Sequence, residues 1–98
     1  MHKGGFIYIL TNQNHTVLYT GTTSNLANRI YQHKTGTFRN AFTSKFNTSL
    51  LVYYEVFDRI EDAIAREKQL KAGSRQKKID LIRKFNPDWK ELKAPIYY

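Results

Sequence analysis

Apolar residues gather in short runs that alternate with polar stretches along this chain. Two runs near its start, residues 6–10 and 17–21, are rich in β-branched and aromatic side chains and flank a polar stretch at 11–15. This pattern predicts a β-hairpin with a polar turn. Because side chains alternate between the faces of a strand, Tyr8 and Tyr19 could lie side by side. Tyrosines are also common in strands for packing alone, and these two residues leave that reading open.

Two segments carry apolar side chains on both faces. In residues 6–10 the alternation gives one face formed by Phe6, Tyr8 and Leu10 and another formed by Ile7 and Ile9. Residues 50–57 are the strongest strand signal in the chain, and both of their faces are largely apolar. We expect this strand to be covered on both sides, as buried strands are.

Residues 26–34 have the period of a helix that buries one apolar stripe. Ser24 is the expected N-cap, and Gly36 is the expected stop at the C-terminal end. Arg29 and His33 are four residues apart, so they lie together along the edge of the buried stripe. Two groups that can carry positive charge therefore project from one line beside the core.

A second helix is predicted for residues 60–72, with Asp58 as its N-cap and Gly73 at its end. On a helical wheel, Glu67 falls inside the apolar stripe of this helix. A buried carboxylate is costly unless it is paired, neutralised or bound to a metal. Glu67 is therefore either one half of an ion pair, with Arg29 or another base, or a metal ligand.

A third helix is predicted for residues 75–85, with Ser74 as its N-cap. Pro87 disfavours helical geometry at Asn86, so the helix ends there. We expect its inward face to consist of Ile79, Ile82 and Phe85. The remaining residues, 88–98, form a C-terminal tail that should pack back partly on the domain and then fray.

The composition is that of one small folded domain over residues 1–98, because 41% of the residues are hydrophobic and 14% are aromatic. Sixteen Lys and Arg against eight Asp and Glu give a formal charge of +8, which favours a polyanionic partner, nucleic acid first. An anionic membrane surface is the competing partner, but no stretch approaches the ~20 apolar residues of a membrane span or resembles a signal peptide. With no cysteine, thiolate metal sites and thiol nucleophiles are excluded, and the cytoplasm is the expected location.

Five residues give a more specific pattern together than any of them gives alone: Tyr8, Tyr19, Arg29, His33 and Glu67. The chain closely resembles the GIY-YIG nuclease superfamily in the order of its motifs, which are Phe6-Ile7-Tyr8, Tyr19-Thr20-Gly21, Leu26-x-x-Arg29-x-x-x-His33, Phe42-Thr43, Val52-Tyr53-Tyr54-Glu55 and Ala63-x-x-Arg66-Glu67-x-x-Leu70-Lys71. The ending, Asn86-Pro87-Asp88-Trp89, is similar to that of small stand-alone bacterial members. Phe6 and Thr20 depart from the Gly and the middle Ile of the family name, and neither side chain carries chemistry.

The resemblance implies a small α/β fold of the α+β type, in which helices flank a three-stranded antiparallel sheet. It also implies hydrolysis of a phosphodiester bond with one divalent cation, Mg²⁺ or Mn²⁺. By the same resemblance, Glu67 is the metal ligand and Arg29 stabilises charge on the attacked phosphate. Tyr8 and Tyr19 match the two motif tyrosines, and His33 matches the histidine one turn after the arginine. A single carboxylate suits Mg²⁺ because this ion keeps several of its waters.

The general base is the least determined part of this site. A tyrosine with an ordinary pKa near 10 is a poor base unless a cation or Arg29 lowers that pKa, whereas a histidine with a pKa near 6.5 needs no such help. We expect Tyr8 to activate a metal-supported water, with Tyr19 and His33 relaying protons or positioning groups.

Four basic residues are expected to contact phosphates: Lys45, Arg75, Lys77 and Lys78. Lys45 is assigned by the resemblance, and the other three by their place on a basic helix. A basic helix face is usually only solvated surface, but the net charge favours phosphate contact without base reading. Asn86 resembles a late polar residue of some relatives and could equally be a helix C-cap.

The sequence therefore predicts a metal-dependent endonuclease, with DNA favoured over RNA as substrate. The alternative is a basic DNA- or RNA-binding module on the same fold without activity, whereas a protein-only adaptor would leave the charge unexplained. A chain of 98 residues has no room for a separate DNA-binding domain. Recognition should then be weak, salt-dependent and guided by branched, nicked or flapped DNA, as in DNA repair or recombination, or be supplied by a partner protein.

Overall fold

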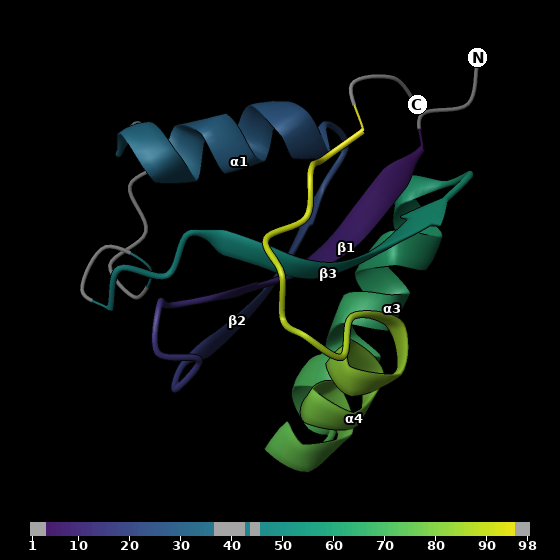
Figure 1. Cartoon of the computed structure of the whole chain (residues 1–98). Helices are drawn as coiled ribbons and strands as arrows, with labels where there is room; N and C mark the ends of the chain where they lie inside the picture. The colour runs from purple at the N-terminus through teal and green to yellow at the C-terminus, as the bar shows by residue number, and fades with distance from the viewer. Residues whose placement is uncertain (1–3, 37–42, 44–45, 96–98) are drawn as a thin grey trace.

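The sheet has three strands, and helices cover both of its faces (Figure 1). The computed structural model describes residues 4–36, 43 and 46–95. Within these residues the elements are β1 (Gly5–Thr11), β2 (Leu18–Thr23), α1 (Leu26–Thr35), β3 (Leu50–Phe57), α3 (Ile60–Ala72) and α4 (Arg75–Phe85). Neighbouring strands are antiparallel in the order β2-β1-β3. The predicted α+β fold with a three-stranded antiparallel sheet is confirmed.

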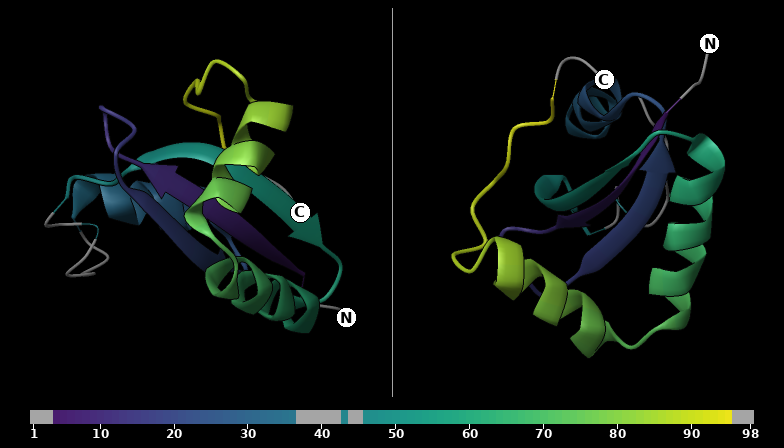
Figure 2. Two further views of the ribbon diagram at one scale, coloured as in Figure 1. Left: turned by 90° about the horizontal axis from the view of Figure 1, so that it is seen from below. Right: turned by 90° about the vertical axis from the view of Figure 1, so that its right-hand side faces the viewer.

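Strand β1 lies in the middle of the sheet and is buried along its whole length. Its alternating side chains enter two apolar clusters, as the sequence predicts. One cluster joins β1 to α3 and α4 and consists of Ile7, Ile9, Val52, Tyr53, Ala63, Leu70 and Ile82. The other joins β1 to α1 and consists of Phe6, Tyr8, Leu10, Leu26, Ile30 and Leu51. Figure 2 shows the result, with α1 on one side of the sheet and α3 and α4 on the other.

Helices α1 and α3 begin at the predicted residues, but the N-cap of each is the residue after the predicted one. Asn25, not Ser24, caps α1: its side chain accepts the N–H of Asn28 at 3.1 Å. The prediction of Ser24 is wrong because the Asn25 carbonyl already accepts the first helical bond, from Arg29 at 3.1 Å. The predicted ends at Gly36 and Gly73 are confirmed.

The N-cap of α3 differs from the prediction in the same way. Arg59 occupies the N-cap position, and its side chain makes no capping hydrogen bond. The prediction of Asp58 as N-cap is wrong because the Arg59 carbonyl accepts the N–H of Asp62 and of Ala63, at 3.1 and 3.4 Å. The exposed Asp58 therefore stands one residue before the first turn.

Helix α4 has the predicted cap and bounds, but its last residue faces outward. Ser74 accepts the N–H of Lys77 at 3.2 Å, and Ile82 is fully buried. The inward placement of Phe85 is wrong: this side chain is 64% exposed. Tyr53 already fills the core beside this turn, so the Phe85 ring lies against the outside of the Tyr53 ring, with ring centroids 5.8 Å apart.

The tail packs back over the start of β3, as predicted for residues 88–95, and residues 96–98 lie outside the described residues. Leu92 donates its N–H to the Leu51 carbonyl at 2.8 Å, and Trp89 packs against the core cluster of α3 and α4. The first half of β3 is accordingly buried, whereas Val56 near its end is 49% exposed. Cover on both sides is therefore correct for the first half of this strand alone. None of the helices in the described part of the chain is long and apolar enough to cross a membrane.

Candidate active site

The candidate site lies along the outer edge of β2, where the two layers of helices approach the same strand. Tyr8 on β1 pairs with Gly21 on β2, and its ring crosses directly over that glycine. A Cβ atom at Gly21 would lie 2.5 Å from both the Cζ and the hydroxyl oxygen of Tyr8. The absence of a side chain at Gly21 therefore lets the buried Tyr8 ring deliver its hydroxyl towards the edge of the sheet.

Three rings meet around the buried Tyr8 hydroxyl. The Tyr8 and Tyr19 ring centroids are 6.3 Å apart, and His33 of α1 lies 6.1 and 5.8 Å from these two rings. The Tyr8 hydroxyl is 3.4 Å from His33 Nε2, a long hydrogen bond. The structure thus places the two motif tyrosines and the predicted histidine side by side.

The surroundings of Tyr8 and His33 favour the neutral form of both groups. Burial and the nearby Tyr19 raise the pKa of Tyr8 well above its usual range, against the opposing charge and hydrogen bond of Arg29. Burial and the charge of Arg29 lower the pKa of His33 from its ordinary value of 6.5. At neutral pH the site therefore holds a phenol beside an uncharged imidazole, which can accept a proton.

Glu67 reaches the same edge from the opposite face of the sheet. Thr22 of β2 donates from Oγ1 to Glu67 Oε1 at 2.7 Å, and Lys71 Nζ lies 2.8 Å from Glu67 Oε2. The Glu67 side chain is only 20% exposed. Its charge also contributes to the raised pKa of Tyr8, so the carboxylate and the phenol interact across the strand.

The carboxylate of Glu67 is held in its ionised form. Partial burial acts to raise its pKa, but hydrogen bonds from Lys71 and Thr22 and the charges of Lys71 and Lys68 outweigh burial and lower the pKa. The ion pair that the sequence allowed for Glu67 exists, and Lys71 is a base in it. Burial and pairing are thus both features of this residue, and neither excludes a metal-binding role.

The donor set fits a weakly held divalent cation. Among the described residues, no three His, Cys, Asp or Glu side chains gather as a metal site. Mg²⁺ does not require such a cage, since it binds through one or two carboxylates and keeps several waters. One ionised carboxylate at an open strand edge, with the Thr22 hydroxyl beside it, matches that preference.

The sequence missed three contributors to this site: Gly21, Thr22 and Lys71. Gly21 stands out in the sequence only as part of a motif, because the sequence does not predict which aromatic ring lies over it. Thr22 gave no signal, since its contact with Glu67 joins residues 45 positions apart. Lys71 could have been found, because it follows Glu67 by four residues on a helix.

The predicted phosphate-contacting residues that the structure describes lie in different surroundings. Lys45 lies outside the described residues. Lys78 lies near Lys71 and Arg75: partial burial and these two charges lower its pKa. Arg75 also donates to the Thr16 carbonyl in the β1–β2 loop at 2.9 Å. Lys71, Lys78 and Arg75 thus form a cationic row that leads from Glu67 towards this loop.

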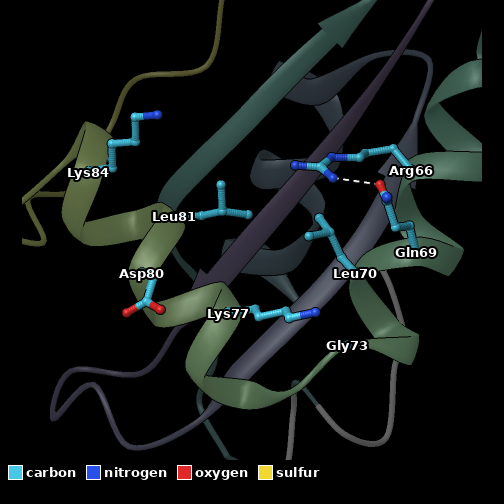
Figure 3. Close-up of a pocket in the computed structure, with 8 residues that line it drawn as sticks. All are labelled: Arg66, Gln69, Leu70, Gly73, Lys77, Asp80, Leu81 and Lys84. Atoms are coloured by element: carbon cyan, nitrogen blue, oxygen red, sulfur yellow. Dashed lines mark hydrogen bonds between the residues drawn. The ribbon is translucent and has the colours of Figure 1, made fainter.

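Lys77 points instead into a groove between α3 and α4, with a volume of about 360 Å³ (Figure 3). The groove is lined by Arg66, Gln69, Leu70, Gly73, Lys77, Asp80, Leu81 and Lys84. None of the residues gathered around Tyr8 and Glu67 is among these. The groove is therefore distinct from the candidate site at the edge of β2.

The motif residues Tyr53, Glu55 and Arg66 serve to fix α3 on the sheet. Arg66 donates from Nε and from Nη2 to Glu55 of β3, at 3.1 and 3.0 Å, and from Nη1 to Gln69 at 2.6 Å. The Tyr53 hydroxyl also donates to Glu55. Since Arg66 immediately precedes Glu67, this network sets the position of the helix turn that carries the carboxylate.

Asn86 has the role of a helix C-cap. It is 7% exposed, and its amide donates to the Val52 carbonyl at 3.0 Å and to the Lys90 carbonyl at 2.8 Å. Its side-chain oxygen accepts the N–H of Lys90 at 3.1 Å. Of the two readings of this residue, the structure supports the C-cap, because the Asn86 backbone N–H donates to the Ile82 carbonyl of α4 at 2.6 Å. The side-chain contacts tie this end of the helix to β3 and to the tail.

Comparison with known proteins agrees with this arrangement. A family model described as the GIY-YIG catalytic domain matches residues 4–80. The chain is 36% identical over 83 residues to a UPF0213 protein of Syntrophus aciditrophicus, covering 85% of this chain and 93% of that protein. It is 38% identical over 78 residues to a UPF0213 protein of Staphylococcus saprophyticus, covering 79% and 92%.

A solved structure is similar as well. The solution NMR structure of a UPF0213 protein from Bacillus halodurans superposes with a TM-score of 0.56 at 26% sequence identity, over 90% of this chain and 92% of that one. The residues of this chain that the family model matches include every residue of the candidate site, from Tyr8 to Lys71. The chain therefore belongs to the GIY-YIG family, and it is similar over most of its length to the small UPF0213 proteins.

Proposed function

We propose that this protein is an endonuclease that hydrolyses phosphodiester bonds in nucleic acid, with DNA as its substrate. The observation that carries the proposal is the convergence on one strand edge of Tyr8 and His33 from one face of the sheet and Glu67 from the other. A phosphate lying along that edge could meet a proton acceptor, a guanidinium and a carboxylate together. Hydrolysis of a phosphodiester needs these functions in one place.

We assign the proton transfers to Tyr8 and His33. The Tyr8 oxygen takes a proton from the attacking water as the phenol gives its own proton to His33 Nε2, which is 3.4 Å away. The relay avoids a free phenolate, whose formation the burial of Tyr8 disfavours. Tyr19 packs against both rings and holds them in place. Arg29 stabilises the negative charge that gathers on the phosphate, a contribution worth roughly 10²–10³-fold in rate for one such donor.

Glu67 is the residue that would hold the divalent cation, Mg²⁺ or Mn²⁺. When bound, the cation supplies positive charge that stabilises the charge developing on the phosphate oxygens. Because hydrogen bonds keep the Glu67 carboxylate ionised, no proton has to leave this residue before a cation binds.

The cationic row formed by Lys71, Lys78 and Arg75 is proposed to bind the phosphate backbone next to the site. Its charges attract a polyanion without reading base edges, so affinity should fall steeply as salt rises. Lys45 is proposed as a further phosphate contact on the grounds of the family resemblance. Recognition is then guided by DNA structure or by a partner protein, and a cytoplasmic location is part of the proposal.

The second candidate function is a binding module without activity. The cationic row favours it, since Lys78 is held among like charges that a polyanion would relieve. A binding module, however, gives no use to a neutral imidazole beside a buried phenol hydroxyl.

The test is cleavage of labelled single-stranded, duplex, flapped and branched DNA with Mg²⁺, Mn²⁺ or EDTA. Parent protein is compared with Glu67→Ala and with Glu61→Ala, a matched loss of one exposed carboxylate on the same helix. We expect cutting that needs the cation, persists in Glu61→Ala and vanishes in Glu67→Ala. Salt-sensitive binding with no cutting by a well-folded parent would instead support the binding module.

A further inference from the structure

Lys71 occupies the position where a cation would approach Glu67. The two carboxylate oxygens of Glu67 are both engaged, Oε1 by the Thr22 hydroxyl and Oε2 by the Lys71 ammonium at 2.8 Å. Thr22 is fixed in a strand, whereas the Lys71 side chain is 54% exposed and flexible. Of the two partners, Lys71 is the one that can leave.

We propose that Lys71 is a displaceable counter-ion that exchanges Glu67 for a substrate phosphate when a divalent cation binds. This inference rests on the proposed function, and adds a coupling between cation binding and nucleic-acid binding. In the absence of a cation, Lys71 neutralises the carboxylate. When a cation binds the carboxylate, the Lys71 ammonium loses its counter-ion, and its charge becomes available to a phosphate beside Lys78 and Arg75.

The surroundings of Lys71 explain why its release would strengthen nucleic-acid binding. The charges of Lys71 and Arg75 both act on Lys78, so Lys78 is repelled by each of them. Glu67 offsets part of this repulsion through its contact with Lys71. Once that contact is lost, the three positive charges stand together, and a phosphate backbone is the ligand that relieves their repulsion.

The first measurement is binding of Mn²⁺ alone by isothermal titration calorimetry, without nucleic acid. Parent protein is compared with Lys71→Gln and with Lys68→Gln, which removes the same charge from the same helix. Lys68 is the matched control because its charge acts on Glu67, whereas Lys71 also contacts that carboxylate directly. We expect Lys71→Gln to bind Mn²⁺ roughly 3- to 10-fold more tightly than Lys68→Gln, the scale of one removed unit charge near a solvent-accessible site.

The second measurement is binding of a labelled duplex by fluorescence anisotropy, with and without Mn²⁺, with the integrity of the DNA checked on a gel. We expect Mn²⁺ to tighten binding by the parent and by Lys68→Gln. The same cation should give a smaller gain in Lys71→Gln, because this variant has no ammonium to release.

The outcomes separate this inference from the nuclease proposal. Glu67→Gln retains an acceptor for Thr22 and serves as the variant without a charged ligand, with its folding checked by circular dichroism. If Glu67→Gln loses Mn²⁺ binding but Lys71→Gln binds no tighter than Lys68→Gln, the exchange of Lys71 is refuted and the metal-dependent nuclease stands. If Glu67→Gln and the parent bind Mn²⁺ equally, Glu67 is not the ligand, and both proposals fail in that respect.

Discussion

At the scale of single residues, the side chains of the site are packed so closely that there is almost no room for an added atom. The Tyr8 ring lies in the core, and its hydroxyl passes over Gly21 with no room for one more carbon atom. His33 is tuned by burial and by Arg29 to stay neutral. The site should therefore be sensitive to added volume at Gly21 and to protonation of His33.

Gly21→Ala should damage both stability and activity. The added Cβ would lie 2.5 Å from Tyr8 Cζ, so the ring must move, at a cost of about 1–3 kcal/mol in unfolding free energy. Displacement of the hydroxyl should lower cleavage by roughly 10²-fold. Chemical denaturation and cleavage rates would measure these effects. In the control Gly73→Ala, where a Cβ meets its nearest atoms at an ordinary 3.5 Å, little change is expected.

Protonation of His33 should limit cleavage on the acid side. Its pKa in the native state lies below the ordinary 6.5, so the rate should stay level down to about pH 6.5 and fall only at lower pH. Between the native and ordinary pKa values the unfolded chain binds more protons, so His33 also makes stability decrease as pH falls through this window. A pH–rate profile together with NMR titration of the imidazole would test this. An imidazole that titrates above pH 6.5 would contradict it.

At the scale of elements, the sequence predicts the order of helices and strands and the first residue of each helix, but not two of the three N-caps. Period and stop signals place the helix ends at Gly36 and Gly73. Ser24 and Asp58 were wrong as caps, because the choice between adjacent residues depends on which carbonyl accepts the first helical bond. Phe85 was misplaced because the wheel gives a direction for the side chain and not the position of Tyr53 beneath it.

The candidate site divides in the same manner between what the sequence reveals and what folding adds. Tyr8, Arg29, His33 and Glu67 were found from residue types and order. The contact of Glu67 with Thr22 was not, because it joins β2 to α3 across the sheet edge. A single sequence carries signals for local geometry, whereas contacts between distant segments become apparent only in the fold.

The tie between β3 and α3 should be worth more than an exposed ion pair. Arg66→Met removes the bonds to Glu55, whose side chain is 24% exposed, and takes away the positive charge paired with this carboxylate, which keeps the Tyr53 hydroxyl as a donor. We expect a loss of about 1.5–3 kcal/mol in unfolding free energy, measured by urea denaturation. Arg59→Met breaks a pair in which both side chains are more than 60% exposed, at 62% and 67%, and should cost less than ~1 kcal/mol. Equal losses in the two variants would contradict a positioning role for Arg66.

At the scale of the whole molecule, the excess positive charge is spread unevenly over the surface. The formal charge is +8, and part of it is gathered in the cationic row beside Glu67. Lys77 and Lys84 face the groove between α3 and α4 instead. The net charge of the entire surface thus attracts a polyanion from a distance. The cationic row then orients the bound polyanion along β2.

Binding of nucleic acid should report this distribution through its salt dependence. Lys78→Gln should reduce the slope of log affinity against log salt by ~1, as expected when one phosphate contact is lost. Lys93→Gln, which removes an exposed lysine of the tail, should leave the slope nearly unchanged. Anisotropy titrations between low and moderate salt would measure both. Identical slopes would mean that Lys78 contacts no phosphate.

The burial of the Tyr8 ring has a consequence for how this chain can change over evolutionary time. Selection for a stable fold alone acts on the ring, which fills the core between β1 and α1, and is indifferent to the oxygen at its tip. A lineage that kept the fold and abandoned the reaction could exchange tyrosine for phenylalanine here at little cost. Retention of the Tyr8 hydroxyl would therefore indicate selection for catalysis, separately from selection for folding.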